Sequence, residues 1–467
     1  MSLSLAPPAN KGLSKLNRDL FKQTLELTAL RLPAPACARA MKELKGGYIL
    51  EVPRLRGIVE DPADLAAGET KKAARRLLLL NPLKAVSKDS LPTPVKEFAT
   101  RENAEITQYR LDLDYDYWTS EQVLRSILPD DIDVPGAYEA VGHIAHLNLR
   151  DQFLPYKSII GEVLLDKNKS LRTIVNKTGN IDNTFRFFEM ELLAGENDLM
   201  AELNESNCKF RFDFSRVYWN SRLQGEHERI VKKFKKNGLV CDVMAGVGPY
   251  AVPAAKNKKL VVFANDLNPS SYEFLCENIK INKVEHLVKP YNMDGRDFVW
   301  QSLDDLNSSG PWDTLRSKIP PSRRPRGSKA TVALDGSPNI EEKDLKAPAP
   351  VSLGPLEPKA GFRWFDHYVM NLPATAIEFL DAFRGLFHNR EIISQDKLPI
   401  IHCHCFSKEE DPSADVIKRV EKVIGASLGS NLIEVHNVRN VAPNKEMLCI
   451  SFRLPSEVAY AEPEALR

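Results

Sequence analysis

One segment of the chain constrains its fold more than any other, because it passes from an apolar strand through a glycine-rich turn into a helix. Residues 239–257 read LVCDVMAGVGPYAVPAAKN, and a second apolar run, LVVFANDLNP, follows directly. A crossover helix, SYEFLCENIKINKV, leads to a third short strand within VKPYNMDGRDF. Strands and helices that alternate at these spacings predict a doubly wound, mostly parallel α/β sheet, which binds its ligand at the carboxyl ends of the strands.

The rest of the C-terminal region continues this sheet after an interruption. The segment 306–362 holds nine prolines, and 316–329 carries six basic residues and no acid, which predicts a flexible insertion. It serves either as a solvated loop or as a basic tether to RNA phosphates. The pattern then predicts a strand in WFDHYVMNLP, a helix at 374–388, a strand in LPIIHCHCF and a helix at 412–426. Two closing runs, NLIEVHNVRNV and EMLCISFRL, predict an antiparallel hairpin at the sheet edge.

Two smaller modules precede this domain, which we place at 223–467. Residues 1–135 mix short helical and strand patterns and predict an appended α/β module. Residues 136–222 predict a small mixed α/β platform, in which Phe210, Phe212 and Phe214 alternate with polar positions. The first 35 residues carry five basic and two acidic side chains, a composition typical of a transit peptide and equally of an ordinary basic helix.

Composition excludes several classes of protein. Lys and Arg number 64 against 63 Asp and Glu, so any nucleic-acid surface has to be a local patch. No long uncharged apolar run is present, which argues against a membrane span. Seven scattered cysteines, an odd number, indicate reduced thiols in an intracellular protein.

The glycine-rich turn is a candidate ligand site. Asp242 ends the first strand, and Gly246 and Gly248 let the backbone approach a ligand beside free N–H groups of the next helix. The turn lacks the third glycine of a dinucleotide fingerprint, and no lysine of a P-loop follows it. By itself the turn fits a ligand site or a structural tight turn.

Two further aspartates make an adenosine cofactor the better interpretation. Asp266 ends the second strand, where a carboxylate accepts hydrogen bonds from ribose hydroxyls. Asp294 ends the third strand, within reach of an adenine amine. Each aspartate alone would fit a helix cap. Without a pyrophosphate fingerprint, S-adenosylmethionine fits the three sites better than NAD.

The tripeptide Asn371-Leu372-Pro373 ends the strand after the insertion, where a side chain would face the transferred methyl group and its acceptor. The Asn-Pro-Pro-aromatic motif of adenine-amino enzymes is missing, and no Pro-Cys pair supplies the nucleophile of a cytosine-C5 enzyme. We therefore expect the acceptor to be a ring nitrogen or another base position.

Several motifs in series resemble the tRNA (guanine-N1) methyltransferases of the archaeal and eukaryotic type, which methylate the guanine at position 37, next to the anticodon. The resemblance covers roughly 136–300 and 363–455. The motifs are GHIAHLNLR, NTFRFFEMELLAGE, RVYWNSRLQGEHERI, DVMAGVGPYAVPAA, ANDLNP, MDGRD and MNLP.

This resemblance implies roles for individual residues in catalysis. Glu226 resembles the proposed general base that removes the N1 proton of guanine, although a glutamate in the first turn of a helix is also favoured by the helix dipole. Arg186 resembles the arginine that stabilises charge on guanine O6, and Asn371 would orient the base edge.

The resemblance also implies binding roles. Tyr218 and Arg222 would line the guanine pocket and contact the tRNA backbone. His227 would lie near the cofactor carboxylate. The adenosine pocket would be lined by Asp266, Leu267, Asp294 and Gly295, with the backbone of the Gly246–Gly248 turn.

A metal site is not expected. In the run HCHC, the strand alternation directs His402 and His404 to one face and Cys403 and Cys405 to the other, so that one tetrahedral ion does not easily collect all four.

The resemblance implies a monomer that acts on tRNA with guanine at position 37, in the mitochondrial matrix, nucleus and cytoplasm, with the N-terminal module recognising tRNA shape. Its product would maintain the reading frame and feed wybutosine synthesis. Two alternatives remain open at this stage: a related methyltransferase for another RNA base, and a tRNA-binding protein without turnover.

Overall fold

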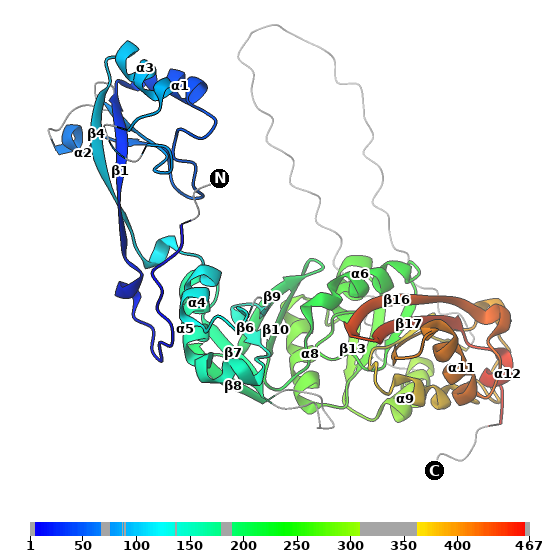
Figure 1. Cartoon of the computed structure of the whole chain (residues 1–467). Helices are drawn as coiled ribbons and strands as arrows, with labels where there is room; N and C mark the ends of the chain where they lie inside the picture. The colour runs from blue at the N-terminus through cyan, green and yellow to red at the C-terminus, as the bar shows by residue number, and fades with distance from the viewer. Residues whose placement is uncertain are drawn as a thin grey trace, which may run out of the picture. The chain divides into compact units, whose positions relative to one another are not determined.

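The computed structural model describes residues 5–66, 75–85, 87, 90–135, 138–178, 189–308 and 362–462. The chain divides into two compact units. Unit 1 comprises Met1–Thr178 and Glu189–Asp198, and unit 2 comprises Gly179–Phe188 and Leu199–Arg467. Figure 1 shows the elements of both units along the chain. Within the described residues, none of the helices has the length and apolar character that crossing a membrane requires.

The first sheet of unit 1 is antiparallel and has the strand order β2-β3-β1-β4. Apolar side chains on its two faces enter different cores: Leu30 and Leu32 pack with the helices, and Leu27 and Ala29 pack on the opposite face. Its elements are β1 (Gln23–Leu32), α1 (Ala34–Glu43), β2 (Ile58–Glu60), α2 (Pro62–Ala66), β3 (Arg76–Leu79), α3 (Thr93–Arg101) and β4 (Glu105–Leu113).

The expectation of a basic helix within the first 35 residues is wrong. A short 3-10 helix, η1 (Arg18–Phe21), is followed at once by strand β1. β1 pairs with β4 along its length, from Gln23 opposite Leu113 to Arg31 opposite Glu105. This pairing joins residues about 80 positions apart in the sequence and satisfies the backbone of a segment whose local composition alone favoured a helix.

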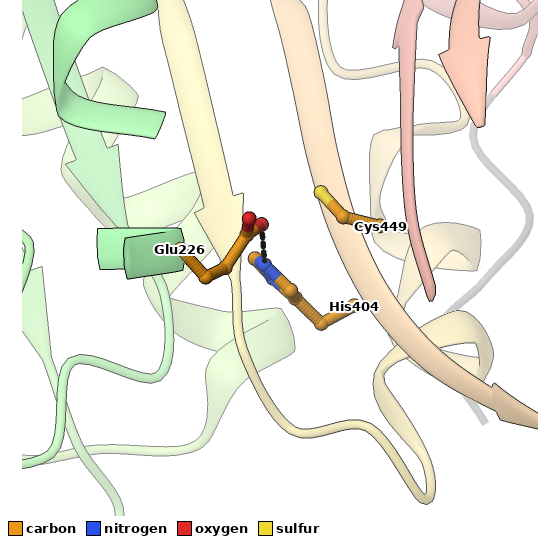
Figure 2. Close-up of side chains that lie close together, drawn as sticks. All are labelled: Glu226, His404 and Cys449. Atoms are coloured by element: carbon orange, nitrogen blue, oxygen red, sulfur yellow. Dashed lines mark hydrogen bonds and ion pairs between the residues drawn. The ribbon is translucent and has the colours of Figure 1, made fainter. Parts of the chain in front are cut away.

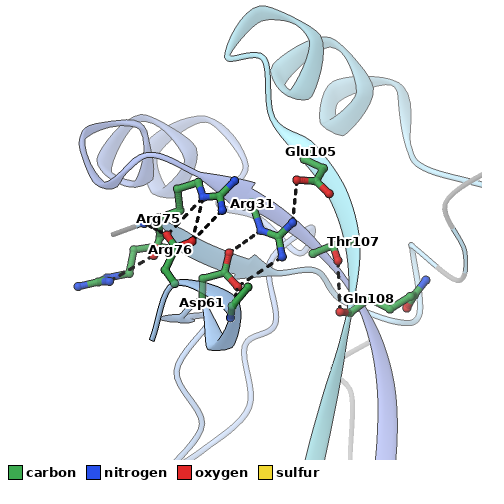
Figure 3. Close-up of polar contacts among 9 residues, drawn as sticks. Arg31, Asp61, Arg75, Arg76, Glu105, Thr107 and Gln108 are labelled. Carbon is green, nitrogen blue, oxygen red and sulfur yellow. Dashed lines mark hydrogen bonds and ion pairs between the residues drawn. The ribbon is translucent and has the colours of Figure 1, made fainter. Parts of the chain in front are cut away.

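Basic side chains at one end of this sheet are paired with acids (Figure 3). Arg31 donates through Nε to Asp61 (2.5 Å) and through Nη1 to Glu105 (2.7 Å). Arg75 donates to Asp64 (2.7 Å). These hydrogen bonds raise the pKa of Arg31 and lower the pKa of Asp64 to about 2. The cluster is therefore close to neutral and does not form a basic patch.

The second sheet of unit 1 has the order β5-β6-β7-β8. Trp118 anchors its core: the side chain is fully buried and Nε1 donates to the backbone oxygen of Phe21 (2.8 Å). The N-cap of α4 is Thr119, which forms a capping box with Gln122. The elements are η2 (Tyr115–Tyr117), α4 (Ser120–Ile127), β5 (Glu139–Val141), β6 (Ile144–Leu147), η3 (Asp151–Tyr156), α5 (Lys157–Lys167), β7 (Thr173–Thr178) and β8 (Glu189–Gly195).

The platform expected at 136–222 is divided between the two units, because its last two strands pack on the large domain. β9 (Met200–Glu205) and β10 (Cys208–Asp213) form a hairpin, with Phe210 and Phe212 buried. Backbone N–H groups of β10 donate to the side chains of Asn278 and Asn282 on or beside helix α8. These contacts attach the hairpin to unit 2.

Unit 2 is built on a seven-stranded sheet with the order β13-β12-β11-β14-β15-β17-β16. The first five of these are parallel, and β17 and β16 form the antiparallel edge hairpin. The predicted fold class is confirmed. The strands are β11 (Leu239–Asp242), β12 (Val261–Asn265), β13 (Val288–Tyr291), β14 (His367–Met370), β15 (Ile400–Ser407), β16 (Leu432–Ala442) and β17 (Lys445–Arg453).

One predicted helix of unit 2 is shorter than expected. In place of a helix at 374–388 the chain forms the 3-10 helix η5 (Ala376–Phe383). The helix ends because Gly385, at φ +73°, and Phe387 donate their backbone N–H groups to α12 (Ser456–Ala459). The remaining helices are η4 (Ser221–Leu223), α6 (Gln224–Lys233), α7 (Ala251–Lys258), α8 (Pro269–Ile281), α9 (Gly295–Asn307), η6 (Gln395–Lys397), α11 (Pro412–Ile424) and η7 (Gly429–Asn431). Most of the predicted insertion, from 309 to 361, lies outside the described residues.

Candidate active site

A cavity of about 240 Å³ lies at the carboxyl ends of the parallel strands of unit 2, where the alternation of strands and helices places a ligand site. Its walls come from the turns after β11, β12, β13 and β14 and from the segment before α6. The edge hairpin contributes Arg439, Val441 and Met447, which sequence reasoning missed. Predicted site residues that line it are Tyr218, His227, Gly246, Asp266, Leu267, Asp294, Gly295 and Asn371.

The glycine turn approaches the cavity as predicted, but Gly246 and Gly248 have different structural roles. Gly246 lines the cavity at φ +55°, and a Cβ placed there would meet open space. Gly248, at φ +98°, is not a lining residue. A Cβ there would come within 2.9 Å of Leu275 and Val252, so this glycine permits close packing of the turn on α7 and α8.

The adenosine end of the cavity is formed by two carboxylates and an apolar slot. Asp266 follows β12 and accepts hydrogen bonds from the N–H groups of Gly246 (2.8 Å) and Asn268 (3.0 Å), and burial raises its pKa. Asp294 caps α9 by accepting from the N–H of Arg296 (2.8 Å). Gly295 is buried close to the ring of Phe379, which also lines the cavity.

The residues at this end fit an adenosine group. Carboxylates that end consecutive strands are suited to ribose hydroxyls and an exocyclic amine, and Leu267 and Phe379 offer apolar surface to a purine ring. The helix-cap interpretation is confirmed for Asp294 and is wrong for Asp266, because the N-cap of α8 is Asn268. Binding by either aspartate stays a prediction.

Asp242 does not line the cavity, contrary to its predicted place in the cofactor site. Backbone pairing with β14 continues past it, through Val243 N–H to Val369 O (2.9 Å), so Asp242 still lies within the sheet. Its carboxylate is fully buried, and among the described residues no hydrogen bond of ordinary geometry reaches either oxygen. Burial, together with the nearby charge of Asp266, raises the pKa of Asp242 to about 8.

His227 is the fourth residue of α6, and it lines the cavity. Its ring is buried, and Nδ1 lies 2.6 Å from Oε1 of Glu205 on β9. The rings of His227 and Tyr250 meet edge to face at a centroid distance of 4.8 Å. The aromatic and carboxylate contacts fix the orientation of the ring at the cavity wall. Glu205 was not predicted from the sequence.

The acceptor end holds Asn371, Pro373 and Tyr218. Oδ1 of Asn371 is buried and has no hydrogen-bond partner among the described residues, which marks it as an acceptor available to a ligand. Tyr218 is 45% exposed. Arg222 is exposed and does not line the cavity. Arg186, the predicted partner of guanine O6, lies outside the described residues.

Glu226 lies in a buried network and not in the cavity lining (Figure 2). Arg229 donates through Nε to Oε2 (2.6 Å) and through Nη2 to Oε1 (2.8 Å). Nε2 of His404, on β15, lies 2.7 Å from Oε1. Burial alone raises the pKa of Glu226, but the hydrogen bonds from Arg229 and His404 outweigh it and lower the pKa to about 2. The carboxylate is therefore ionised at neutral pH.

Three potential metal ligands meet in this network: Glu226, His404 and Cys449, whose ligand atoms lie within 4.8 Å of one another. The guanidinium of Arg229 bonds both carboxylate oxygens. A cation at the same carboxylate would face this positive charge, so we interpret the cluster as an ion-pair network. Sequence reasoning named Glu226 and His404 separately but did not connect them.

Comparison with known proteins establishes the family. A protein of Batrachochytrium dendrobatidis named tRNA (guanine(37)-N(1))-methyltransferase is 56% identical over 471 residues, covering 100% of this chain and 94% of that protein. The chain belongs to the tRNA (guanine(37)-N(1))-methyltransferase family. A family member from Schizosaccharomyces pombe is 42% identical, covering 97% of this chain and 96% of its own length.

Domain profiles agree with this assignment, and solved structures share the fold. The profile of the TRM5/TYW2 methyltransferase domain matches residues 201–307, and the TYW2 N-terminal domain matches residues 120–198. Trm5b from Pyrococcus abyssi shares the fold with a TM-score of 0.53 at 20% identity, over 91% of this chain and 99% of that one. The aTrm5 chain of a complex with tRNALeu gives a TM-score of 0.58 at 20% identity and the same coverage. The family resemblance read from the motifs is confirmed.

Proposed function

We propose that this chain transfers a methyl group from S-adenosylmethionine to N1 of the guanine at position 37 of tRNA. The observation that carries the proposal is 56% identity, over the whole chain, to a protein that bears this activity in its name. The cavity supports it, because it joins an adenosine-sized slot to a polar acceptor end at the carboxyl edge of the sheet.

The cofactor side of the site is assigned from its lining residues. Asp266 would accept hydrogen bonds from the ribose hydroxyls and Asp294 from the adenine amine, while His227 would meet the amino-acid end. When bound, the cofactor supplies an electrophilic methyl group on a sulfonium. The backbone of the Gly246 turn, with space where a side chain would otherwise lie, leaves room for this part of the ligand.

The acceptor side recognises a base that has left its stack. Tyr218 offers an exposed aromatic face beside the cavity, and base–aromatic stacking is the usual way a protein holds a flipped nucleotide. The free Oδ1 of Asn371 would accept a hydrogen bond from a donor on the guanine edge. Arg186, which lies outside the described residues, would stabilise charge on O6.

Glu226 would take the N1 proton, because guanine N1 carries a proton at neutral pH and becomes nucleophilic only as that proton leaves. Both of its oxygens are bonded to Arg229 or His404, so the carboxylate has to exchange at least one of these bonds for the N1–H group. This exchange also raises its proton affinity, since the same bonds lower its pKa to about 2.

Finer features of the function remain predictions. These are entry of the product into wybutosine synthesis, maintenance of the reading frame, recognition of tRNA shape by the N-terminal module, a monomeric state, and a distribution among mitochondrial matrix, nucleus and cytoplasm.

A transfer assay tests the proposal. Tritiated S-adenosylmethionine is incubated with the full-length chain and with two tRNA transcripts that differ only in guanine or adenine at position 37. We expect label in the guanine transcript and background in the adenine transcript. Equal labelling of both would show that another base is the acceptor.

A further inference from the structure

Glu226 is held by two cationic groups of different kinds. Arg229 has a long side chain from the same helix that is 20% exposed, and its Nη1 also donates to Glu434 (2.5 Å) on β16. His404 comes from β15, an interior strand of the sheet, and is fully buried. Because the imidazole is short and enclosed by the sheet, His404 is the more rigid of the two anchors.

The two anchors divide the carboxylate oxygens unequally. His404 bonds Oε1 alone, whereas Arg229 bonds both oxygens. If Arg229 moves away, Oε1 remains fixed by His404 and Oε2 loses its nearest hydrogen-bond donor. Only one other described nitrogen is recorded near Oε2, Nε2 of His436, at 3.9 Å.

His404 also connects Glu226 to the cavity. Oη of Tyr250, a lining residue, lies 3.4 Å from the same Nε2 that bonds Glu226. The Tyr250 ring in turn packs against His227. A buried chain of contacts therefore runs from the cavity wall through Tyr250 and His404 to the carboxylate.

We propose that His404 is a positioning residue that holds Oε1 of Glu226, so that Oε2 is the oxygen that accepts the N1 proton of guanine. This inference rests on the proposed function of Glu226 as the base. The N1–H proton passes to Oε2, and the electron pair of that bond stays on N1, which then attacks the methyl carbon. His404 keeps its own proton and touches no reacting atom.

The charges around the carboxylate decide its ionisation. Burial alone lowers the pKa of His404, but Cys449 and Glu226 beside it raise the pKa to about 10. His404 therefore faces Glu226 as an imidazolium at neutral pH. The titratable and charged groups that face this pair from the packed elements are Arg229 and Lys233 of α6, Asp242 of β11, Tyr250 beside α7, Glu434 and His436 of β16, and Cys449 of β17.

The test compares His404→Gln with His402→Gln. His402 lies two residues earlier on the same strand, is equally buried, and contacts Ser451 (2.8 Å) and His367 (3.1 Å) instead of Glu226. Single-turnover rates are measured from pH 5 to pH 9 with saturating cofactor and guanine-37 transcript. KM for both substrates is measured at pH 7.5.

We expect His404→Gln to lower the single-turnover rate on the order of 10–100-fold, because a displaced base loses alignment with N1. KM values should change less than about twofold, since no binding contact is lost. Loss of the imidazolium removes one charge-assisted hydrogen bond and raises the pKa of Glu226 from about 2 by about one to two units, so the carboxylate stays ionised throughout the assay and the rate loss should be the same from pH 5 to pH 9. His402→Gln should keep the wild-type profile. Equal profiles for the two variants would overturn the proposal.

A measurement on the wild-type protein tests the proposal even if the variant misfolds. The 15N shifts of the His404 ring, assigned by their absence from the His404→Gln spectrum or by selective labelling, should show both nitrogens protonated at pH 8. A ring that carries no proton on Nε2 at pH 7 would contradict the proposal.

Glu226→Gln separates the inference from the function on which it rests. If this variant keeps the wild-type single-turnover rate, Glu226 is not the base, and the proposed roles of Glu226 and His404 are both refuted. If Glu226→Gln is slow but His404→Gln matches wild type, Glu226 is supported as the base and only the positioning role of His404 is refuted.

Discussion

Asp242→Asn should change the pH dependence of stability in a way that can be calculated from the structure. The Asp242 carboxylate is fully buried and receives no hydrogen bond of ordinary geometry from the described residues, and burial with the charge of Asp266 raises its pKa to about 8. In the unfolded chain the group ionises near pH 4. Between about pH 4 and pH 8 the folded state therefore binds one proton more than the unfolded state.

This difference makes the wild-type protein less stable as the pH rises. Within that window, each rise of one pH unit lowers the free energy of unfolding by about 1.4 kcal/mol. The step from pH 5 to pH 7 therefore lowers it by about 2.7 kcal/mol through Asp242. Asparagine does not ionise, so the Asp242→Asn variant should not show this decrease in the free energy of unfolding. The free energy of unfolding of Asp242→Asn relative to wild type should rise by about 2.7 kcal/mol over the same step.

The assay has to report on unit 2 alone. Urea-dependent hydrogen exchange, read by mass spectrometry in peptides that cover β11 and β12, gives the free energy of unfolding of this unit in the cofactor-free protein. Asp297→Asn, which changes an exposed carboxylate of α9, serves as the control. Parallel pH profiles for wild type and Asp242→Asn would refute the reasoning, because they would mean that Asp242 is ionised in the folded state.

Three further predictions follow from local geometry. Gly248→Ala should lower the free energy of unfolding by about 1–3 kcal/mol, measured by urea denaturation, because its Cβ would lie 2.9 Å from two side chains; Gly246→Ala, in open space, should chiefly weaken cofactor binding by calorimetry. Asn371→Ala should lower kcat on the order of 100-fold in steady-state assays if its side chain orients the base. Trp118→Ala should destabilise unit 1 by about 3–5 kcal/mol, seen as faster exchange in that unit.

The sheet of unit 2 was predictable because its strands can be recognised from their local sequence. Strands buried on both faces are continuous apolar runs, as in β12, and the helices between them fix the parallel order. The same order places the strand ends at one edge, so Asp266, Asp294 and Asn371 could be expected around one cavity before any coordinates were known. The prediction that Asp242 lines the cavity was wrong, because the strand pairing continues one residue further and keeps Asp242 inside the sheet.

The network around Glu226 could not be predicted, because its partners are distant in the sequence and carry no local pattern. Glu434 lies 205 residues from Arg229, and His404 lies 178 residues from Glu226. Their meeting depends on the register of the edge hairpin, which is shifted at three points along β16 and β17. The strand at the N-terminus was missed for the same reason, since its partner, β4, is non-local.

The ring position of the new methyl group tests the central claim most directly. Guanine-37 tRNA is treated with the chain and S-adenosylmethionine, digested to nucleosides, and analysed by chromatography and mass spectrometry against methylguanosine standards. The account predicts 1-methylguanosine as the product, lost on treatment with Glu226→Gln. A methyl group on N2 or N7 would contradict it, because neither product requires the N1 proton to be removed. A methyl group on O6 would contradict the assignment of N1 as the attacking atom.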